Sequence, residues 1–167
     1  MKKIAIVGSM GVGKTTLAKG IAKEKGYQIL PEAARVVAKM GHKLDKKITV
    51  ETEYKILEMQ KILESQDAPW IADRCLIDLM AYVVVLFRKE AGLINAVRKA
   101  LEKAKYDLVI YIAPEFPIKK DGIRTTDTKF QKEIDTRIKI VLKDAGVKWI
   151  KVSGSKINRL NQVLAII

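Results

Sequence analysis

The sequence contains one cysteine, one histidine and no long hydrophobic run, and each scarcity excludes a class of protein. Cys75 alone cannot build a disulfide framework, and a single thiol fits a reducing compartment, so we expect the protein in the cytoplasm. With only Cys75 and His42, the chain lacks the cysteine and histidine ligands of a structural zinc site. The most apolar stretch, residues 81–87, is shorter than the roughly 20 residues that span a bilayer, so we expect no membrane partner.

The composition is that of a folded domain with a strongly basic surface. The chain has 167 residues, of which 49% are hydrophobic and 31% charged, so we expect a single domain over residues 1–167. Its formal net charge is +13. Because the lysines are scattered and mixed with acidic residues, we interpret this charge as a solvated surface of the kind found in thermophilic proteins. Contact with nucleic acid is the alternative, since clustered lysines would bind phosphates.

Short apolar runs alternate with helical patterns along the chain. The predicted strands cover residues 3–7, 27–30, 69–72, 108–113 and 147–152. The predicted helices cover residues 15–25, 32–40, 49–66, 76–87, 91–104, a segment that begins at 128, and 156–164. This alternation predicts an α/β fold in three layers, with a parallel sheet between two layers of helices.

Two local signals need interpretation. Residues 83–85 are all valine and favour a strand by propensity, but the length of the apolar pattern around them favours a helix, which we predict. Thr128, followed three residues later by Gln131, predicts a capping box at the start of a helix.

Residues 8–15, Gly-Ser-Met-Gly-Val-Gly-Lys-Thr, match the Walker A pattern G-x-x-x-x-G-K-[ST] between a predicted strand and a predicted helix. The glycines allow a tight turn whose N–H groups point inward, and the helix N-terminus adds partial positive charge. We expect Lys14 to reach the β- and γ-phosphates and the Thr15 hydroxyl to ligate Mg²⁺. The predicted nucleotide-binding residues are Gly8, Ser9, Gly11, Val12, Gly13, Lys14, Thr15 and Thr16.

The residues after the third predicted strand distinguish among P-loop proteins. An Asn-Lys-x-Asp segment, which reads guanine in GTPases, does not occur. The strand ends in Asp73-Arg74, whereas a motor ATPase usually has Asp-Glu there. Asp73 can bind Mg²⁺ or accept a proton, and Arg74 can stabilise phosphoryl oxygens. This pair favours transfer to a bound acceptor over hydrolysis.

Two further groups of residues are candidates for the acceptor side. Glu32 and Arg35 follow the second predicted strand on one helix face, so Glu32 could act as a general base while Arg35 holds a phosphate or ribose. An exposed ion pair is the alternative interpretation. The loop 114–127 is basic and could close as a lid that supplies Arg124 to the transition state, or it could be a charged surface loop.

On these residues, the chain resembles the small P-loop nucleoside and nucleotide kinases, in particular the AAA-type P-loop domain family that includes the ribosylnicotinamide kinases. The likeness runs over nearly the whole chain: the Walker A segment, residues 31–35, Asp73-Arg74 with Asp78 and Tyr82, residues 121–124, and residues 152–155. It implies a five-stranded sheet of adenylate-kinase type, ATP with Mg²⁺ as cofactors, and a lid around Arg124. The acid-x-x-Arg segment also resembles phage-type polynucleotide 5′-hydroxyl kinases, although the acid there is commonly aspartate.

The leading hypothesis is therefore an ATP-dependent kinase that acts on a nucleoside, a nucleotide or a nucleic-acid 5′-hydroxyl. The predicted catalytic residues are Lys14, Glu32, Asp73 and Arg124, the predicted metal ligands Thr15 and Asp73, and the predicted acceptor-binding residues Glu32, Arg35 and Arg74. Glu32 and Asp73 are both candidates for the base. The alternative hypothesis is a P-loop ATPase without kinase activity, or a nucleotide-dependent module that binds nucleic acid.

Overall fold

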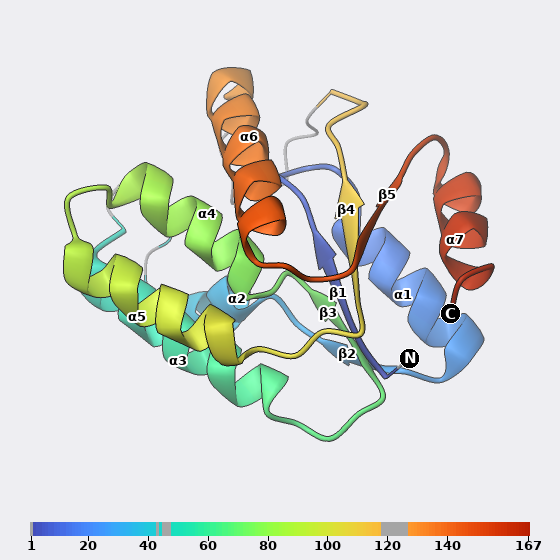
Figure 1. Cartoon of the computed structure of the whole chain (residues 1–167), viewed down its shortest axis with the longest axis horizontal. Helices are drawn as coiled ribbons and strands as arrows, with labels where there is room; N and C mark the ends of the chain where they lie inside the picture. Colours follow the sequence, from blue (N-terminus) through green and yellow to red (C-terminus); the bar gives the residue numbers. More distant parts are fainter. Residues whose placement is uncertain (1, 43, 45–47, 118–126) are drawn as a thin grey trace.

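The computed structural model describes residues 2–42, 44, 48–117 and 127–167, whose five strands form one parallel sheet (Figure 1). The strands are β1 (Lys3–Val7), β2 (Gln28–Leu30), β3 (Trp70–Asp73), β4 (Leu108–Ile112) and β5 (Trp149–Val152). They lie in the order β2-β3-β1-β4-β5, and each neighbouring pair is parallel. The predicted five-stranded α/β fold is therefore confirmed.

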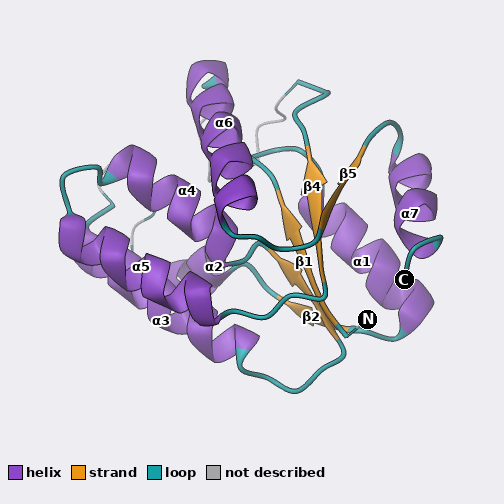
Figure 2. Cartoon of the chain, viewed as in Figure 1, coloured by secondary structure: helices purple, strands orange, loops and turns teal. Residues whose placement is uncertain are grey.

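Seven helices in the described residues connect and cover the strands (Figure 2). They are α1 (Lys14–Lys25), α2 (Ala33–Lys39), α3 (Val50–Glu64), α4 (Leu76–Leu86), α5 (Ala91–Lys103), α6 (Thr128–Asp144) and α7 (Lys156–Leu164). Residues 83–85 lie inside α4, which confirms the choice of helix over strand. The long apolar face of this segment overrides the strand propensity of its valines.

The start of α6 differs from the prediction. Asp127 Oδ1 accepts hydrogen bonds from the backbone N–H groups of Lys129 (2.8 Å) and Phe130 (3.2 Å), so Asp127 is the N-cap. The predicted capping box of Thr128 and Gln131 is wrong. A carboxylate is among the best N-caps, since it also complements the positive end of the helix dipole. The Gln131 side chain can therefore reach another part of the chain.

Helices cover both faces of the sheet, and the alternation of side chains along each strand divides the core in two. Ile4 and Ile6 of β1 pack with apolar residues of α1 and α7, whereas Ala5 and Val7 pack with apolar residues of α2 to α6. Figure 1 shows α1 and α7 on one side of the sheet and α3, α4 and α5 on the other. Burial on both faces explains why β1 and β4 are continuous apolar runs in the sequence.

The parallel topology brings the sequence candidates to one edge of the sheet. The Walker A loop follows β1, one residue separates Glu32 from the end of β2, and Asp73 is the last residue of β3. Because β1 lies between β3 and β4, these groups surround the crevice at the carboxyl ends of the strands, where open α/β sheets bind ligands.

Two further predictions concern the lid and a membrane-spanning segment. Residues 118–126, the larger part of the predicted lid 114–127 and including Arg124, lie outside the described residues. Within the described ranges, every helix falls short of the length and apolarity that a membrane span requires.

Candidate active site

The backbone path of the Walker A loop requires glycine at two positions, Gly8 and Gly13. Gly8 has a φ of 153°, and a Cβ atom built there would lie 2.5 Å from the carbonyl oxygen of Ile112 on β4. Gly13, the N-cap of α1, has a φ of 96°, in the left-handed region that favours glycine. The loop can therefore curl against β4 and present its backbone N–H groups to the crevice.

The eight predicted nucleotide-binding residues lie together in this loop and the first turn of α1. Gly11, Gly13, Thr15 and Thr16 are exposed. The remaining four, Gly8, Ser9, Val12 and Lys14, are buried. The exposed positions form an open cradle, as phosphate binding by backbone N–H groups requires.

Lys14 is buried inside the cradle. Its Nζ donates hydrogen bonds to the carbonyl oxygens of Gly8 and Ser9, each at 2.7 Å. Burial, together with the nearby Arg74 charge, lowers the pKa of Lys14 below that of an exposed lysine. An ammonium group in this position gains stabilisation from a bound polyphosphate.

Side chains from three helices hold the loop in this conformation. Asp78 Oδ1 on α4 accepts a hydrogen bond from the Gly8 N–H at 3.2 Å. Gln131 Nε2 on α6 donates to the Met10 carbonyl at 2.7 Å. Arg159 Nη1 on α7 donates to the Val12 carbonyl at 2.6 Å. The cradle is thus fixed from three sides. None of these supports was assigned from the sequence, since each joins positions far apart in the chain.

Thr15 and Asp73 form the predicted metal pair. The Thr15 hydroxyl donates to Asp73 Oδ2 at 2.5 Å. The other oxygen, Oδ1, is buried and has no hydrogen-bond partner in the described part of the chain. A hydroxyl and a carboxylate beside a phosphate site are the ligands that Mg²⁺ takes in P-loop enzymes, and the second carboxylate oxygen leaves a position for a metal-bound water. The residues therefore fit Mg²⁺.

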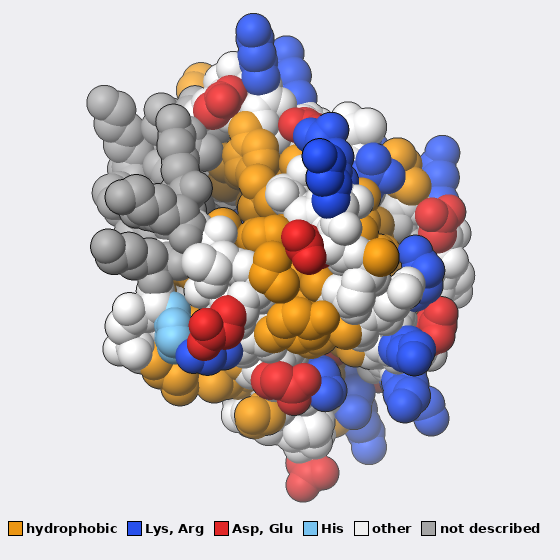
Figure 3. All heavy atoms as spheres, turned by 90° about the vertical axis from the view of Figure 1, so that its left-hand side faces the viewer, with side chains coloured by type: hydrophobic (Ala, Val, Ile, Leu, Met, Phe, Trp, Pro, Cys, Tyr) orange, Lys and Arg blue, Asp and Glu red, His pale blue; other side chains and the backbone are white. Residues whose placement is uncertain are grey.

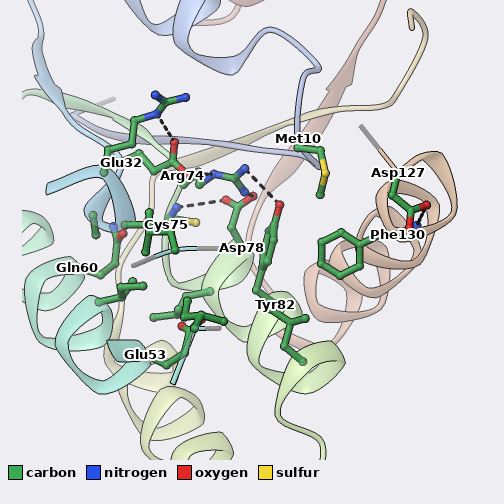
Figure 4. Close-up of a pocket in the computed structure, with 18 residues that line it drawn as sticks. Met10, Glu32, Glu53, Gln60, Arg74, Cys75, Asp78, Tyr82, Asp127 and Phe130 are labelled. Carbon is green, nitrogen blue, oxygen red and sulfur yellow. Dashed lines mark hydrogen bonds and ion pairs between the residues drawn. The ribbon is translucent and has the colours of Figure 1, made fainter. Parts of the chain in front are cut away.

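Glu32, Arg35 and Arg74 form one charged cluster rather than an exposed pair (Figure 4). Glu32 Oε2 lies 3.0 Å from Arg35 Nε, and Glu32 Oε1 lies 2.9 Å from Arg74 Nε. The side chains of Arg74 and Glu32 are only 9% and 8% exposed, so the ion pair between them is screened by solvent far less than a surface ion pair. The structure thus brings together all three predicted acceptor-binding residues.

Arg74 is held in a fixed position by its backbone and its neighbours. Its φ is 81°, an unusual value for a residue with a side chain, and such strain concentrates at functional sites. Its guanidinium lies 3.3 Å from Asp78 Oδ1 and donates to the Tyr82 hydroxyl at 3.3 Å, with its centre 5.0 Å from the Tyr82 ring centroid. The arginine is therefore oriented before any ligand binds.

A pocket of about 600 Å³ opens beside this cluster, between α2, α3, α4 and α6. Its size is in the range of small-molecule sites. Glu32, Arg35, Arg74, Asp78 and Tyr82 line it, whereas Lys14 and Asp73 do not. Most of the other lining residues are apolar: Met10, Ala33, Ala34, Leu44, Ile48, Ile56, Cys75, Leu79, Leu86 and Phe130. The charged cluster therefore lies between a phosphate cradle and an apolar cavity.

The sequence interpretation missed Glu53 and Gln60, which line the same pocket from α3. A signal for them exists. Both fall on the buried face of the predicted helix 49–66, where apolar residues would be expected. Cys75 also lines the pocket, and burial raises the pKa of its thiol well above the usual value, so it acts there as a packed apolar residue.

The basic charge is dispersed on the face that Figure 3 shows. Lys and Arg side chains there are interspersed with Asp and Glu and separated by hydrophobic side chains. On this view of the described residues, no continuous basic patch comparable to a nucleic-acid footprint is visible.

Comparison with known proteins identifies a family model and several similar folds. A model described as an AAA domain matches residues 3–159. A deoxyadenosine kinase from M. mycoides, solved with dCMP and dCDP, is 18% identical with a TM-score of 0.70, over 98% of this chain and 96% of that one. The YorR protein of Bacillus subtilis, in complex with phosphorylated GDP, is 19% identical with a TM-score of 0.62, over 98% and 94%.

The NadR protein in complex with NR is 18% identical with a TM-score of 0.79, over 97% of this chain and 49% of that one. The chain thus spans about half the length of NadR. No curated protein sequence matches the chain significantly. At these identities the similar structures show a shared fold.

Proposed function

The chain belongs to the AAA domain family whose model matches residues 3–159, and from this premise we propose that it is a P-loop kinase. It transfers the γ-phosphate of ATP, with Mg²⁺, to a hydroxyl group of a nucleoside or nucleotide. One observation carries the proposal: Asp78 supports the cradle at Gly8, and it also lines the acceptor pocket with Glu32 and Arg74. Donor and acceptor sites that share a wall favour direct transfer over hydrolysis.

On the donor side, the backbone of the cradle and Lys14 bind the phosphates. Thr15 and Asp73 hold Mg²⁺, which when bound neutralises charge on the phosphate oxygens. Arg74 lies at the boundary with the pocket and stabilises the transferring phosphoryl group. Arg124 has the same proposed role from the lid, in the part of the chain that the structure does not describe.

On the acceptor side, Glu32 is favoured over Asp73 as the general base. Glu32 lines the pocket, whereas Asp73 does not line it and accepts a hydrogen bond from the Thr15 hydroxyl. Glu32 takes the proton of the acceptor hydroxyl while the oxygen of that hydroxyl bonds to the γ-phosphorus. The bond between that phosphorus and the bridging oxygen then breaks, and ADP leaves. Arg35 pairs with Glu32 and orients both the carboxylate and the acceptor.

The shape of the pocket favours a small acceptor over a polynucleotide. An apolar cavity of about 600 Å³ suits a heterocyclic ring with a sugar, and a nucleic acid would need a basic track along its backbone. The similar structures agree in kind, because they are complexes with nucleotides or with NR. ATP as the donor is supported by NadR, which was solved with AMP-PNP.

The test is phosphoryl transfer from γ-labelled ATP to a panel of nucleosides, nucleotides and 5′-hydroxyl oligonucleotides. We expect label on one or more small acceptors, with transfer that requires added Mg²⁺. Lys14→Ala should lower kcat/KM by about a hundred- to a thousandfold, because a preorganised positive group at the phosphates is lost. Lys19→Ala, on the exposed side of the same helix, is the matched control and should retain full activity.

Two results would reject this proposal. Transfer that survives Lys14→Ala unchanged would remove the cradle from the mechanism. ATP hydrolysis that nucleic acid stimulates, with no label on any acceptor, would support a nucleic-acid-dependent ATPase instead.

A further inference from the structure

Glu53 is a buried acid whose carboxyl group the described chain does not pair. The residue is 3% exposed, on the face of α3 that lines the pocket. Its Oε2 atom is buried and has no hydrogen-bond partner in the described residues. Burial raises the pKa of Glu53 to about 7, and no cation among the described residues offsets this effect. Buried polar groups are otherwise almost always paired, so this carboxyl needs an explanation.

The position of Glu53 relates it to the acceptor rather than to the phosphates. Figure 4 shows Glu53 on the side of the pocket away from Met10 and Glu32. The cluster of Glu32 and Arg74 is at the cradle end, where the reacting hydroxyl must lie. A ligand that places its hydroxyl there and fills the cavity brings its far end to Glu53.

A second side chain on α3 adds another hydrogen-bond acceptor to the side of the pocket that α3 forms, the α3 wall. Gln60 follows Glu53 by two helical turns and also lines the pocket. Its amide nitrogen donates to Glu64 Oε1 at 2.9 Å, and Glu64 in turn accepts the Tyr106 hydroxyl at 2.6 Å. The bond to Glu64 uses one of the two N–H groups of the Gln60 amide and leaves the amide oxygen as an acceptor. The α3 wall thus presents hydrogen-bond acceptors.

We propose that Glu53 is a specificity-determining residue that pairs with an N–H-bearing edge of the heterocyclic ring of the acceptor. The inference rests on the proposed kinase function and deepens it. The acceptor is a nucleoside-like molecule with a hydroxyl group at one end and an amino or amide N–H at the other. The charged cluster of Glu32, Arg35 and Arg74 at the cradle end and the carboxyl group of Glu53 on α3 give the pocket two chemically different ends, which fixes the direction in which the ligand enters.

The experiment compares ring systems that differ only in the N–H group. Adenosine is compared with purine riboside and cytidine with 2-pyrimidinone riboside, each of which lacks only the exocyclic amine of its partner. Equilibrium binding by calorimetry and transfer from ATP are measured for the wild type, Glu53→Gln, Glu53→Leu and the control Glu51→Gln. Glu51 is exposed on the same helix and pairs with Lys55.

We expect the wild type to bind a preferred N–H-bearing nucleoside about ten- to a hundredfold more tightly than its partner without the group, the range for a hydrogen bond to a charged group. Glu53→Leu should abolish this preference through KM, with kcat and ATP affinity little changed and a melting temperature equal to or above that of the wild type. Glu53→Gln should retain part of the preference, since its amide oxygen still accepts, and Glu51→Gln all of it.

The possible failures are distinguishable. If neither these nucleosides nor the nucleotides of the transfer panel bind or accept phosphate, the proposed function itself fails. If nucleosides are phosphorylated but Glu53→Leu leaves the N–H preference intact, only the role of Glu53 is wrong. Loss of ATP affinity and of stability together in Glu53→Leu would also contradict the proposal, because it would make the residue structural.

Discussion

The phosphate cradle and the acceptor pocket share an edge of the sheet, yet they are built in different ways. The cradle is one contiguous segment, residues 8–15, whose carbonyl and N–H groups are held by side chains of α4, α6 and α7. The pocket collects side chains from positions 10 to 130, and it contains a carboxyl oxygen without a partner among the described residues. Backbone groups suit the phosphates of the donor, which do not vary, whereas side chains from separate helices suit the acceptor, which does.

Glu32 stands at the boundary of the two regions, and replacing it is expected to have the largest effect. Glu32→Gln keeps the shape of the side chain but removes the proton acceptor, so kcat should fall by about a hundred- to ten-thousandfold. The KM for ATP should change little, because the ion pairs of Glu32 with Arg35 and Arg74 lie outside the Walker A loop. Steady-state kinetics with ATP and the acceptor varied separately give both values.

The matched control is Glu58→Gln, which replaces an exposed acid on α3 that pairs with Lys61. A melting curve of Glu32→Gln separates catalysis from folding, since breaking the contact to Arg74 also removes a buried ion pair. A folded Glu32→Gln enzyme with normal kcat would assign the base to Asp73 and place proton transfer on the donor side.

Gly8 tests whether the cradle is as intolerant of side chains as its geometry indicates. In Gly8→Ala the new Cβ would lie 2.5 Å from the Ile112 carbonyl, at a φ of 153°. Strain and overpacking together should lower the free energy of unfolding by roughly 2–4 kcal/mol and should weaken ATP binding. Urea unfolding and calorimetric titration with ATP measure the two effects.

Gly146→Ala is the control, because Gly146 has a φ of 62° but no described atom lies within 4 Å of the position that its new methyl group would take. There we expect a loss of about 1 kcal/mol and unchanged ATP affinity. Equal losses at the two glycines would mean that φ alone matters and that the contact with β4 does not.

The same contrast explains what the sequence could reveal. The Walker A motif is local, so the loop between β1 and α1 could be predicted from eight neighbouring letters, and its role as a phosphate site stays a prediction. The order of strands and helices was also predictable, because apolar runs and amphipathic periods are local patterns. The pocket was not, because Glu53 and Gln60 become site residues only when α3 packs against α2 and α4.

The wrong prediction at the start of α6 and the missed conformation of Arg74 also concern features that local patterns do not reveal. The local spacing of Gln131 allows it a place in a helix cap, but its amide reaches Met10, 121 positions away. Asp127 is the better cap, and its one-residue offset from Thr128 could not be decided without the geometry. The unusual φ of Arg74 has no sequence signal, because arginine is not a residue type that favours the left-handed region.

Replacing Arg159 is expected to have the smallest effect, and it separates the cradle from the acceptor pocket most sharply. It is 6% exposed, and its guanidinium donates to the Val12 carbonyl at 2.6 Å and to Glu115 at 3.2 Å, with its centre 5.4 Å from the Phe116 ring centroid. It does not line the acceptor pocket. Arg159→Met preserves the apolar stem and removes these hydrogen bonds, so the KM for ATP should rise by about tenfold.

In the same variant, the KM for the acceptor should stay within about twofold of the wild-type value, an effect smaller than one hydrogen bond. Arg98→Met, which replaces an exposed arginine on α5 that bonds to Asn95, is the control and should change neither constant. A parallel rise in both KM values would show that the cradle transmits its position to the pocket through Gly8 and Asp78, which a direct hydrogen bond joins. The two regions would then be coupled halves of one site, joined through Asp78.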